Sequence, residues 1–350
     1  MSWLVSLLVL SALIFFHELG HYLVARFVGV YVEVFSIGFG KKLFSFSKWG
    51  TQWSISAIPL GGYVQMKGQD DSDPSKQSFD SDSYTTKTPL QKIFILLAGP
   101  FANFVVAFFL YFSIAFGGPQ VLSPVIGKVV KNSPAQLANL QENDIIKKIN
   151  NKEIATWNKM AKVISNAKGS LELYIQRDGF FEYKTLTPKL SETKNMYGET
   201  VQRKMIGITS AGVTHTLELD FPQKITYALE QTSNAANMIF TGLEKLILGE
   251  VAAKELGGVI SIVKITSDAS EAGWMSVAFF AALISVNLGV LNLLPIPALD
   301  GGHIMFNLYE MITKKAPSQK VLVNLTIAGW VLLFSLMGLG LFNDINRLIG

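Results

Sequence analysis

Hydrophobic residues along the chain gather in four long runs separated by more polar stretches. The runs cover residues 3–25, 93–116, 274–294 and 321–342, and each approaches the roughly 20 apolar residues that a helix needs to cross a bilayer. Charged residues make up only 16% of the chain, whereas soluble domains have about 25%. The pattern predicts a multi-pass α-helical membrane protein with four transmembrane helices.

Basic residues indicate how these helices are oriented. None precedes Arg26, whereas Arg26, Lys41, Lys42 and Lys48 follow the first run, so the positive-inside rule places this side in the cytoplasm and both termini in the periplasm. The alternative for the first run is a secretory signal peptide. The run lacks the basic start and the small-residue cleavage site that a signal peptide requires.

Residues 30–68 have a different pattern, in which Val, Phe, Ser and Ile alternate between glycine pairs. Such alternation is typical of short β-strands. We expect these strands to turn at Lys41-Lys42 and to form a sheet beside the membrane helices.

A polar insertion separates the second and third runs. Its first part, residues 117–200, contains "SPA", "NDIIKKINN" and "LELYIQRDG" and resembles a single bacterial PDZ domain of α+β fold. Such domains capture an extended peptide or a C-terminus by strand addition beside a backbone loop, and by position we expect this loop at residues 123–127. A spacer that only restricts access is the alternative.

The rest of the insertion, residues 201–273, is predicted to be a linker with an amphipathic helix at 222–248. Apolar residues recur there at helical spacing. The helix could lie on the membrane surface or pack on the membrane helices. The sequence leaves both possibilities open.

The motif "HELGH" interrupts the first hydrophobic run. Residues i and i+4 share one face of a helix, so His17 and His21 can bind one metal ion. Glu18 can then act as the general base on a metal-bound water, as in zinc hydrolases. A buried histidine pair is the alternative, but ionisable groups at membrane depth are costly and are commonly functional.

A catalytic zinc ion usually has three protein ligands. The chain has no cysteine, so the third ligand must be another histidine or a carboxylate. The best candidate is Asp300, which follows the third run in "NLLPIPALDGGH". His303 is a rival ligand or a neighbour of the site, and His215 is expected to be a surface residue.

Several motifs occur together in one order along nearly the whole chain. They are "HELGH", "FSIGFG", "IPLGGYVQM", "LLAGPFAN", the PDZ-like insertion and "ISVNLGVLNLLPIPALDGGH", followed by "LMGLGLFNDINRL". In this combination the chain resembles the site-2 proteases, which are intramembrane zinc metalloproteases, and within them the bacterial regulator-of-sigma-E-protease branch. Many relatives in that branch carry two PDZ domains, whereas this insertion has room for one.

The resemblance implies one Zn²⁺ per chain, bound by His17, His21 and Asp300, with Glu18 as the catalytic base. It implies that the strands before Lys67 form a membrane-associated sheet that pairs with the substrate. It also implies substrate contacts at a further set of residues: Gly61, Gly62, Asn103, Asn292 and Pro297.

The predicted function is cleavage within the transmembrane segment of single-pass membrane proteins, such as an anti-sigma factor or signal-peptide remnants. The predicted location is the bacterial inner membrane, with the active site near its cytoplasmic side and the protein a monomer. The net charge of +4 without a dense basic cluster argues against nucleic acid as a partner. The main alternative is a non-catalytic PDZ scaffold with a structural metal. A membrane-tethered protease of soluble segments and a zinc transporter fit the motifs less well.

Overall fold

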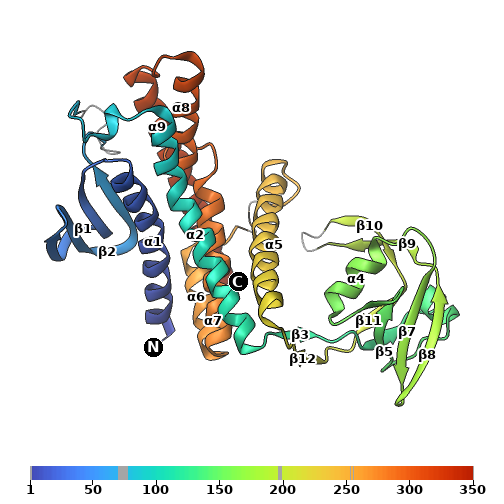
Figure 1. The fold of residues 1–350 in the computed structure, drawn as a ribbon. Helices are drawn as coiled ribbons and strands as arrows, with labels where there is room; N and C mark the ends of the chain where they lie inside the picture. Colours follow the sequence, from blue (N-terminus) through green and yellow to red (C-terminus); the bar gives the residue numbers. More distant parts are fainter. Residues whose placement is uncertain (1, 70–77, 196–198, 253, 255, 350) are drawn as a thin grey trace. The chain divides into compact units, whose positions relative to one another are not determined.

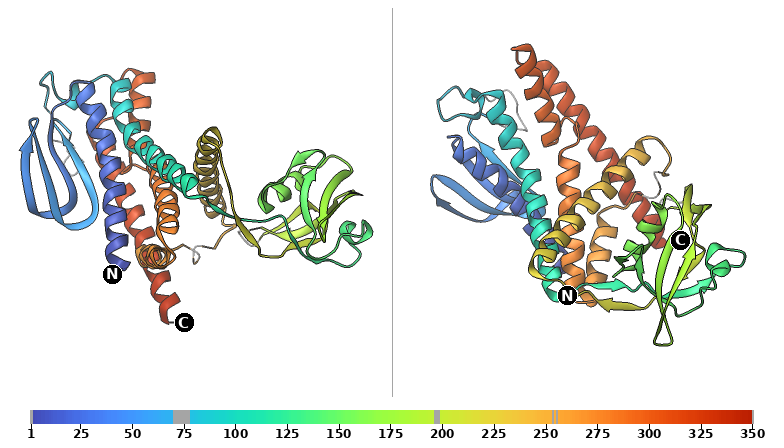
Figure 2. Two further views of the ribbon diagram at one scale, coloured as in Figure 1. Left: turned by 60° about the horizontal axis from the view of Figure 1, so that its bottom comes forward. Right: turned by 45° about the vertical axis from the view of Figure 1, so that its right-hand side comes forward.

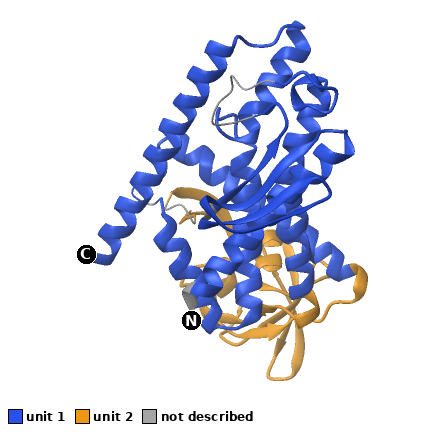
Figure 3. Cartoon of the chain, turned by 90° about the vertical axis from the view of Figure 1, so that its left-hand side faces the viewer, with its two compact units in different colours: residues 1–114, 223–350 blue, residues 115–222 orange. Residues whose placement is uncertain are grey.

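The structure is a computed structural model that describes residues 2–69, 78–195, 199–252, 254 and 256–349. The chain divides into two compact units (Figure 3). Unit 1 comprises Met1–Ile114 and Gln223–Gly350, and unit 2 comprises Ala115–Pro222. The predicted membrane parts and the insertion therefore fold as separate bodies.

Unit 1 is a helical bundle with a small sheet beside it (Figure 1). Its helices are α1 (Ser2–Phe27), α2 (Pro89–Gly117), α5 (Phe221–Ile247), α6 (Val259–Glu271), α7 (Trp274–Asn292), α8 (Asp300–Thr313) and α9 (Gln319–Ile349), with a short 3-10 helix at Tyr84–Thr86. Within the described residues, α1, α2, α7 and α9 are long and apolar enough to cross a membrane. They coincide with the four hydrophobic runs and support the predicted membrane protein.

Helix α5 contains the predicted amphipathic segment. Its buried residues Ala228 and Ala235 belong to one apolar cluster with residues of α2 and α7, including Tyr111 and Val286. Small residues let helices approach closely in a membrane protein. The helix therefore packs on the bundle, which answers the question that its sequence left open.

Helix α6 lies inside the segment predicted as a linker and packs against α1, α7 and α9. Its first turn is capped from α9, because the buried carboxylate of Asp344 accepts hydrogen bonds of 3.0 Å from the backbone N–H groups of Gly258 and Ser261. A carboxylate at a helix N-terminus satisfies donors that the helix itself leaves unpaired. The segment is thus an ordered part of unit 1.

The sheet of unit 1 consists of β1 (Val32–Lys48) and β2 (Thr51–Met66), two long strands with register shifts. Residues 32–37 pair with 62–66 and also with 52–55, while residues 42–48 pair with 51–56. Residues 62–66 therefore form one edge of the sheet. The sheet packs against α1, because Phe35 of β1 and Tyr22 of α1 are buried in the same apolar cluster.

Both predicted turn residues, Lys41 and Lys42, fall within β1, but β1 changes direction around them. Residues 34–37 pair with 52–55 in rising order, whereas residues 44–48 pair with 55–51 in falling order, so the chain reverses between Ile37 and Phe44, as predicted.

The chain reverses again at Trp49 and Gly50, which have φ angles of +56° and +79°. Two positive φ values match the twist of a tight hairpin, and glycine adopts the second without strain. The alternation of apolar residues predicted the strands but not their length.

The hairpin turn is fastened to the end of α1. Arg26 donates a hydrogen bond of 3.3 Å to the carbonyl of Trp49, and Tyr31 donates one of 2.5 Å to the carbonyl of Gly50. At the opposite end of the sheet, Gly62 lies against Ile14 of α1. The sheet thus lies alongside the half of α1 that contains the HELGH motif (Figure 2).

Unit 2 is an α+β body. It contains β3 (Gln120–Leu122), β4 (Ile126–Val129), α3 (Pro134–Leu137), β5 (Ile145–Ile149), β6 (Lys152–Glu153), α4 (Trp157–Ser165), β7 (Leu171–Arg177), β8 (Phe180–Leu186), β9 (Lys189–Lys194), β10 (Thr200–Met205), β11 (Ile208–Ser210) and β12 (Thr214–Thr216). Strands β6, β5, β7 and β8 form the largest sheet. Its core is aliphatic and includes Ile146, Leu173 and Met160.

The C-terminal limit of unit 2 differs from the predicted domain end at residue 200. Strands β10, β11 and β12 pair with β9, β4 and β3, and Ile206 is buried in the same core as Ile146. The pairings of β11 with β4 and of β12 with β3 join residues that are far apart in the sequence, so local patterns did not reveal them. The α+β composition is as expected, and the PDZ assignment stays a prediction.

Residues 123–127, the predicted backbone loop beside which a peptide would add as a strand, are hydrogen-bonded within unit 2. Strand β4 pairs with β11 on one side, and on the other side the N–H of Ile126 donates to the carbonyl of Asp144 at 2.9 Å. The backbone here is already paired within unit 2. Peptide capture by the unit stays a prediction.

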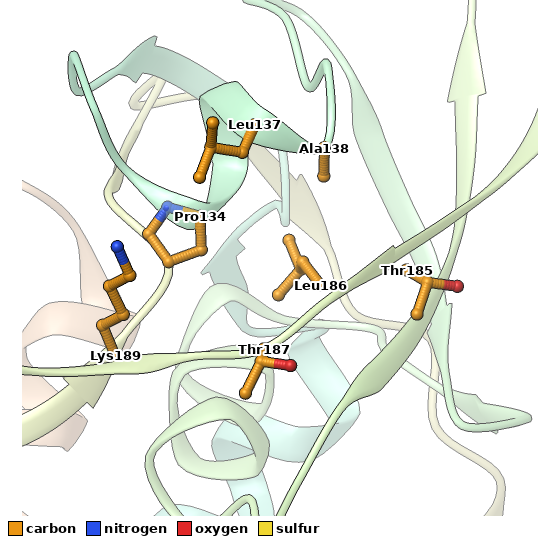
Figure 4. A pocket seen from close by; sticks show the side chains of 7 residues that line it. All are labelled: Pro134, Leu137, Ala138, Thr185, Leu186, Thr187 and Lys189. Carbon is orange, nitrogen blue, oxygen red and sulfur yellow. The ribbon is translucent and has the colours of Figure 1, made fainter.

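Figure 4 shows a pocket of unit 2 between α3 and the connection from β8 to β9. Its lining consists of Pro134, Leu137, Ala138, Thr185, Leu186, Thr187 and Lys189. Since this lining has no acid and no histidine, the pocket offers no metal site and no acid–base pair.

Asp144 forms a buried ion pair with Arg177 in unit 2. It is fully buried and accepts two hydrogen bonds of 2.7 Å from Arg177 and one of 2.8 Å from the N–H of Gln141. The hydrogen bonds from Arg177 to this carboxylate also raise the pKa of the guanidinium above its ordinary value. The ion pair links the residue before β5 to the last residue of β7.

We predict that Asp144→Asn destabilises unit 2 by about 3 kcal/mol, because it removes one charge of a buried pair and leaves the guanidinium uncompensated. Hydrogen exchange of the full-length protein in detergent should show amides of residues 115–222 exchanging about a hundredfold faster. Asp178→Asn, at an exposed neighbouring position, is the matched control. Equal protection in the two variants would contradict a stabilising role of the pair.

Candidate metal centre

His17 and His21 lie one turn apart on α1, as their spacing predicted. Their rings meet edge to face with centroids 4.8 Å apart, and the two Nε2 atoms are 3.2 Å apart. Both residues are buried. An apolar helix of this length keeps the two imidazoles on one face and inside the bundle.

Asp300 reaches this pair from the other end of the chain. It is the first residue of α8, and its Oδ2 lies 3.3 Å from Nε2 of His17 and 3.4 Å from Nε2 of His21. The connection between α7 and α8 packs closely on the start of α8. A Cβ on Gly301 would lie 2.2 Å from the carbonyl oxygen of Leu294. Glycine is therefore required for Asp300 to occupy this place.

The three atoms form a nearly equilateral triangle, with separations between 3.2 and 3.4 Å. A tetrahedral zinc ion with bonds of about 2.0–2.1 Å holds its nitrogen and oxygen ligands about 3.3 Å apart. Oδ2 of Asp300 is buried and accepts no hydrogen bond within the described part of the chain. The donor set and its spacing fit a zinc ion, and His17, His21 and Asp300 are the cluster of potential metal ligands that the described residues contain.

The ring of His21 is oriented from behind by α2. Its Nδ1 is 2.8 Å from the carbonyl oxygen of Ile95. A carbonyl can only accept, so Nδ1 carries a hydrogen, and Nε2, which faces Asp300, is the ring atom available to bind a metal. Hydrogen bonds of this kind fix the tautomer and direction of a metal-binding histidine.

Gly99 of α2 provides the room for this ring. A Cβ built on Gly99 would lie 2.2 Å from Nε2 of His21. Sequence reasoning did not single out this glycine or the carbonyl of Ile95. In the sequence, Gly99 is marked only by its place before Pro100 in "LLAGPFAN", one of the motifs that carry the family resemblance.

Glu18 is half-buried beside the triad and faces the sheet. A Cβ on Gly62 of β2 would lie 3.1 Å from Cγ of Glu18. The backbone of the edge 62–66 therefore passes directly next to the predicted general base. A strand edge and a carboxylate are brought together here by residues far apart in the sequence.

The remaining predicted residues occupy different places. Gly61 has a φ of +143° and lies against the ring of Phe39. Asn292 is the last residue of α7, and Pro297 lies in the connection to α8. Asn103 of α2 is fully buried, and its Nδ2 is 3.2 Å from Nδ1 of His17. Asn103 therefore contacts one of the candidate metal ligands.

The two other histidines lie outside the triangle. His303 is on α8 and packs edge to face with Phe306, and it is not part of the ligand cluster found among the described residues. His215 of unit 2 forms a hydrogen bond of 2.8 Å between its Nδ1 and the hydroxyl of Ser123. The position of His303 does not support its assignment as a rival ligand, and His215 is half-buried rather than fully exposed.

Comparison with known proteins identifies the family of this chain. The model of peptidase family M50 matches residues 5–336. The chain belongs to peptidase family M50. This membership confirms the family resemblance that the motifs indicated.

Three bacterial relatives carry the provisional name zinc metalloprotease. The Campylobacter jejuni protein is 46% identical and aligns over 100% of this chain and 94% of its own length. A Helicobacter pylori protein is 42% identical over 99% of this chain and 100% of its own. A Clostridium perfringens protein is 36% identical over 97% of both.

We predict that Gly99→Ala weakens zinc binding at least tenfold, because the added methyl group occupies the position of the His21 ring and displaces Nε2. The effect should be of the size seen when a metal ligand loses its orientation, about 10–100-fold. The measurement is zinc affinity of the purified full-length protein by competition with a chromogenic chelator.

Gly338→Ala in α9 is the matched control, since a Cβ there meets no atom within 4 Å and alanine favours a helix over glycine. Its zinc affinity should equal that of the wild type. Unchanged affinity of Gly99→Ala would contradict the tight packing of His21 on α2.

Proposed function

We propose that this chain is an intramembrane zinc metalloprotease that hydrolyses a peptide bond within the transmembrane segment of single-pass membrane proteins. The observation that carries the proposal is the buried triangle that Asp300 of α8 forms with His17 and His21 of α1, a helix that is apolar and long enough to cross a membrane. Family membership and the provisional names of the relatives support the zinc and the protease chemistry.

His17, His21 and Asp300 would hold one Zn²⁺ per chain. When bound there, Zn²⁺ polarises the substrate carbonyl and lowers the pKa of a bound water to about 7. Glu18 takes the proton from the attacking water and passes it to the leaving amine. Its position one residue after His17, beside the triangle, suits this role.

The edge of the sheet at residues 62–66 is the proposed docking place for the substrate. A transmembrane helix satisfies its own backbone hydrogen bonds, and these hide its carbonyls. Within the described sheet, residues 62–66 pair with residues 32–37 on one side only. An unwound substrate segment can therefore pair with the other side, next to Glu18, with Gly61, Gly62, Asn292 and Pro297 as candidate contacts.

The proposed setting is the bacterial inner membrane, with the centre near the cytoplasmic side, unit 2 in the periplasm and a monomeric protein. Anti-sigma factors and signal-peptide remnants are the proposed substrate classes. Unit 2 would act as a single PDZ-like domain that either binds a peptide or restricts access. The bilayer itself would bring the enzyme and its substrates together.

A non-catalytic scaffold with a structural metal is the second candidate. Structural zinc sites normally have four protein ligands, whereas the cluster in the described residues has three. A site with three protein ligands leaves a position for water or substrate, which favours catalysis.

We predict that Glu18→Gln binds zinc as tightly as the wild type but cleaves about 10²–10⁴-fold more slowly, the usual contribution of a general base. The test is reconstitution in liposomes with a model single-pass helix, scoring cleavage with and without a zinc chelator. Full activity of Glu18→Gln would refute the assignment of the base. Zinc binding without any cleavage by the wild type would favour the scaffold.

We also predict that helix stability within the substrate opposes cleavage. Replacing two central glycines of the model helix by leucine stabilises it by roughly 0.8 kcal/mol each, so kcat/KM should fall about tenfold. The same two replacements at the far end of the helix serve as the control. Equal cleavage of both substrates would show that the enzyme does not need to unwind the helix.

A further inference from the structure

Asn103 occupies a place behind the metal centre. This residue of α2 is fully buried, and Nδ2 of its amide lies 3.2 Å from Nδ1 of His17. This is the ring nitrogen opposite the Nε2 atom that faces Asp300. The resemblance implied that Asn103 contacts substrate, but a side chain with no exposed surface cannot touch a peptide unless the bundle opens.

The chemistry of His17 requires an acceptor at this place. If Nε2 of His17 binds a metal, its lone pair points to the metal and the neutral ring carries its hydrogen on Nδ1. A buried N–H needs a hydrogen-bond acceptor. The hydrogen-bond partner of Nδ1 is Nδ2 of Asn103, which in this orientation acts as a donor and suits only the opposite tautomer.

The amide of Asn103 also has an acceptor to offer. Its Oδ1 is buried and has no hydrogen-bond partner among the residues that the structure describes. A half-turn about the Cβ–Cγ bond exchanges Oδ1 and Nδ2. It places Oδ1 on Nδ1 of His17, which satisfies the histidine N–H and uses the unpaired oxygen.

We propose that Asn103 is a positioning residue of the metal centre. Its side-chain carbonyl accepts the Nδ1–H of His17 and holds the ring in the tautomer whose Nε2 faces His21 and Asp300. Helix α2 then orients both histidines, His21 through the carbonyl of Ile95 and His17 through Asn103. This inference deepens the proposed function and rests on its zinc site.

The position of Asn103 is itself held in place. Its backbone carbonyl accepts a hydrogen bond of 2.8 Å from Ser285 of α7, a residue that is also fully buried. Asn103 therefore links the helix with the histidine motif to the helix that leads toward Asp300. A fixed backbone leaves rotation of the amide as the adjustable element.

The experiment measures zinc affinity of two variants of the purified full-length protein by chelator competition. Asn103→Leu removes the acceptor while keeping a side chain branched at Cγ, and it should weaken zinc binding about 10–100-fold, as loss of a partner behind a metal ligand does. Asn103→Asp keeps an acceptor and cannot donate, so it should bind zinc as tightly as the wild type or more tightly.

Nitrogen-15 NMR of histidine-labelled protein provides the second measurement. In the zinc-loaded wild type, we expect the His17 Nδ1 signal of a protonated ring nitrogen, and we expect it to change in Asn103→Leu. Asn343→Leu is the matched control, because Asn343 is a buried asparagine of α9 that bonds the carbonyl of Leu256 at 3.1 Å. Its zinc affinity should stay at the wild-type value.

Three results would overturn the assignment. Wild-type zinc affinity in Asn103→Leu would remove the positioning role, and with a raised KM it would return Asn103 to substrate contact. Loss of zinc in Asn103→Asp equal to that in Asn103→Leu would mean that the amide donates to His17. Failure of the wild type to bind zinc would instead refute the proposed function, and the assignment with it.

Discussion

The structure depends on the convergence of His17, His21 and Asp300 in the interior of an apolar bundle. Ionisable side chains are costly at membrane depth unless they have partners, and here the three groups are each other's partners within 3.4 Å. A divalent cation between them would compensate the charge of the buried carboxylate and bind the two ring nitrogens that face it. The ends of the chain are thereby joined through one small site, because α1 and α8 each supply part of it.

Close helix approach makes this convergence possible. A Cβ on Gly20 of α1 would lie 2.3 Å from the carbonyl oxygen of Ala98 in α2, and one on Gly289 of α7 would lie 3.1 Å from the carbonyl of Pro100. In lipid, tight packing between small residues replaces much of the hydrophobic force that holds soluble helices together. The same closeness lets α2 contact both histidines with groups that orient their rings.

In the proposed function, the sheet of unit 1 brings a peptide to this buried centre. Its edge at residues 62–66 lies against Glu18, while its turn is tied to Arg26 and Tyr31 at the end of α1. The sheet therefore shares a frame with the metal ligands, and an added strand would keep a fixed register to them. Unit 2 has its own core around Ile146 and its own buried ion pair, so its stability does not depend on that of the site.

Local patterns were sufficient for the four apolar helices and for the pairing of His17 with His21, because helical spacing and apolar length are written in neighbouring residues. Asp300 followed from the scarcity of other acids at membrane depth. The turn at Trp49, the extension of unit 2 to Pro222 and the contacts of Gly99 and Asn103 with the two histidines did not follow. Each of these is set by segments far apart in the chain that meet only on folding, and a single sequence carries no local signal of which backbone will approach which side chain.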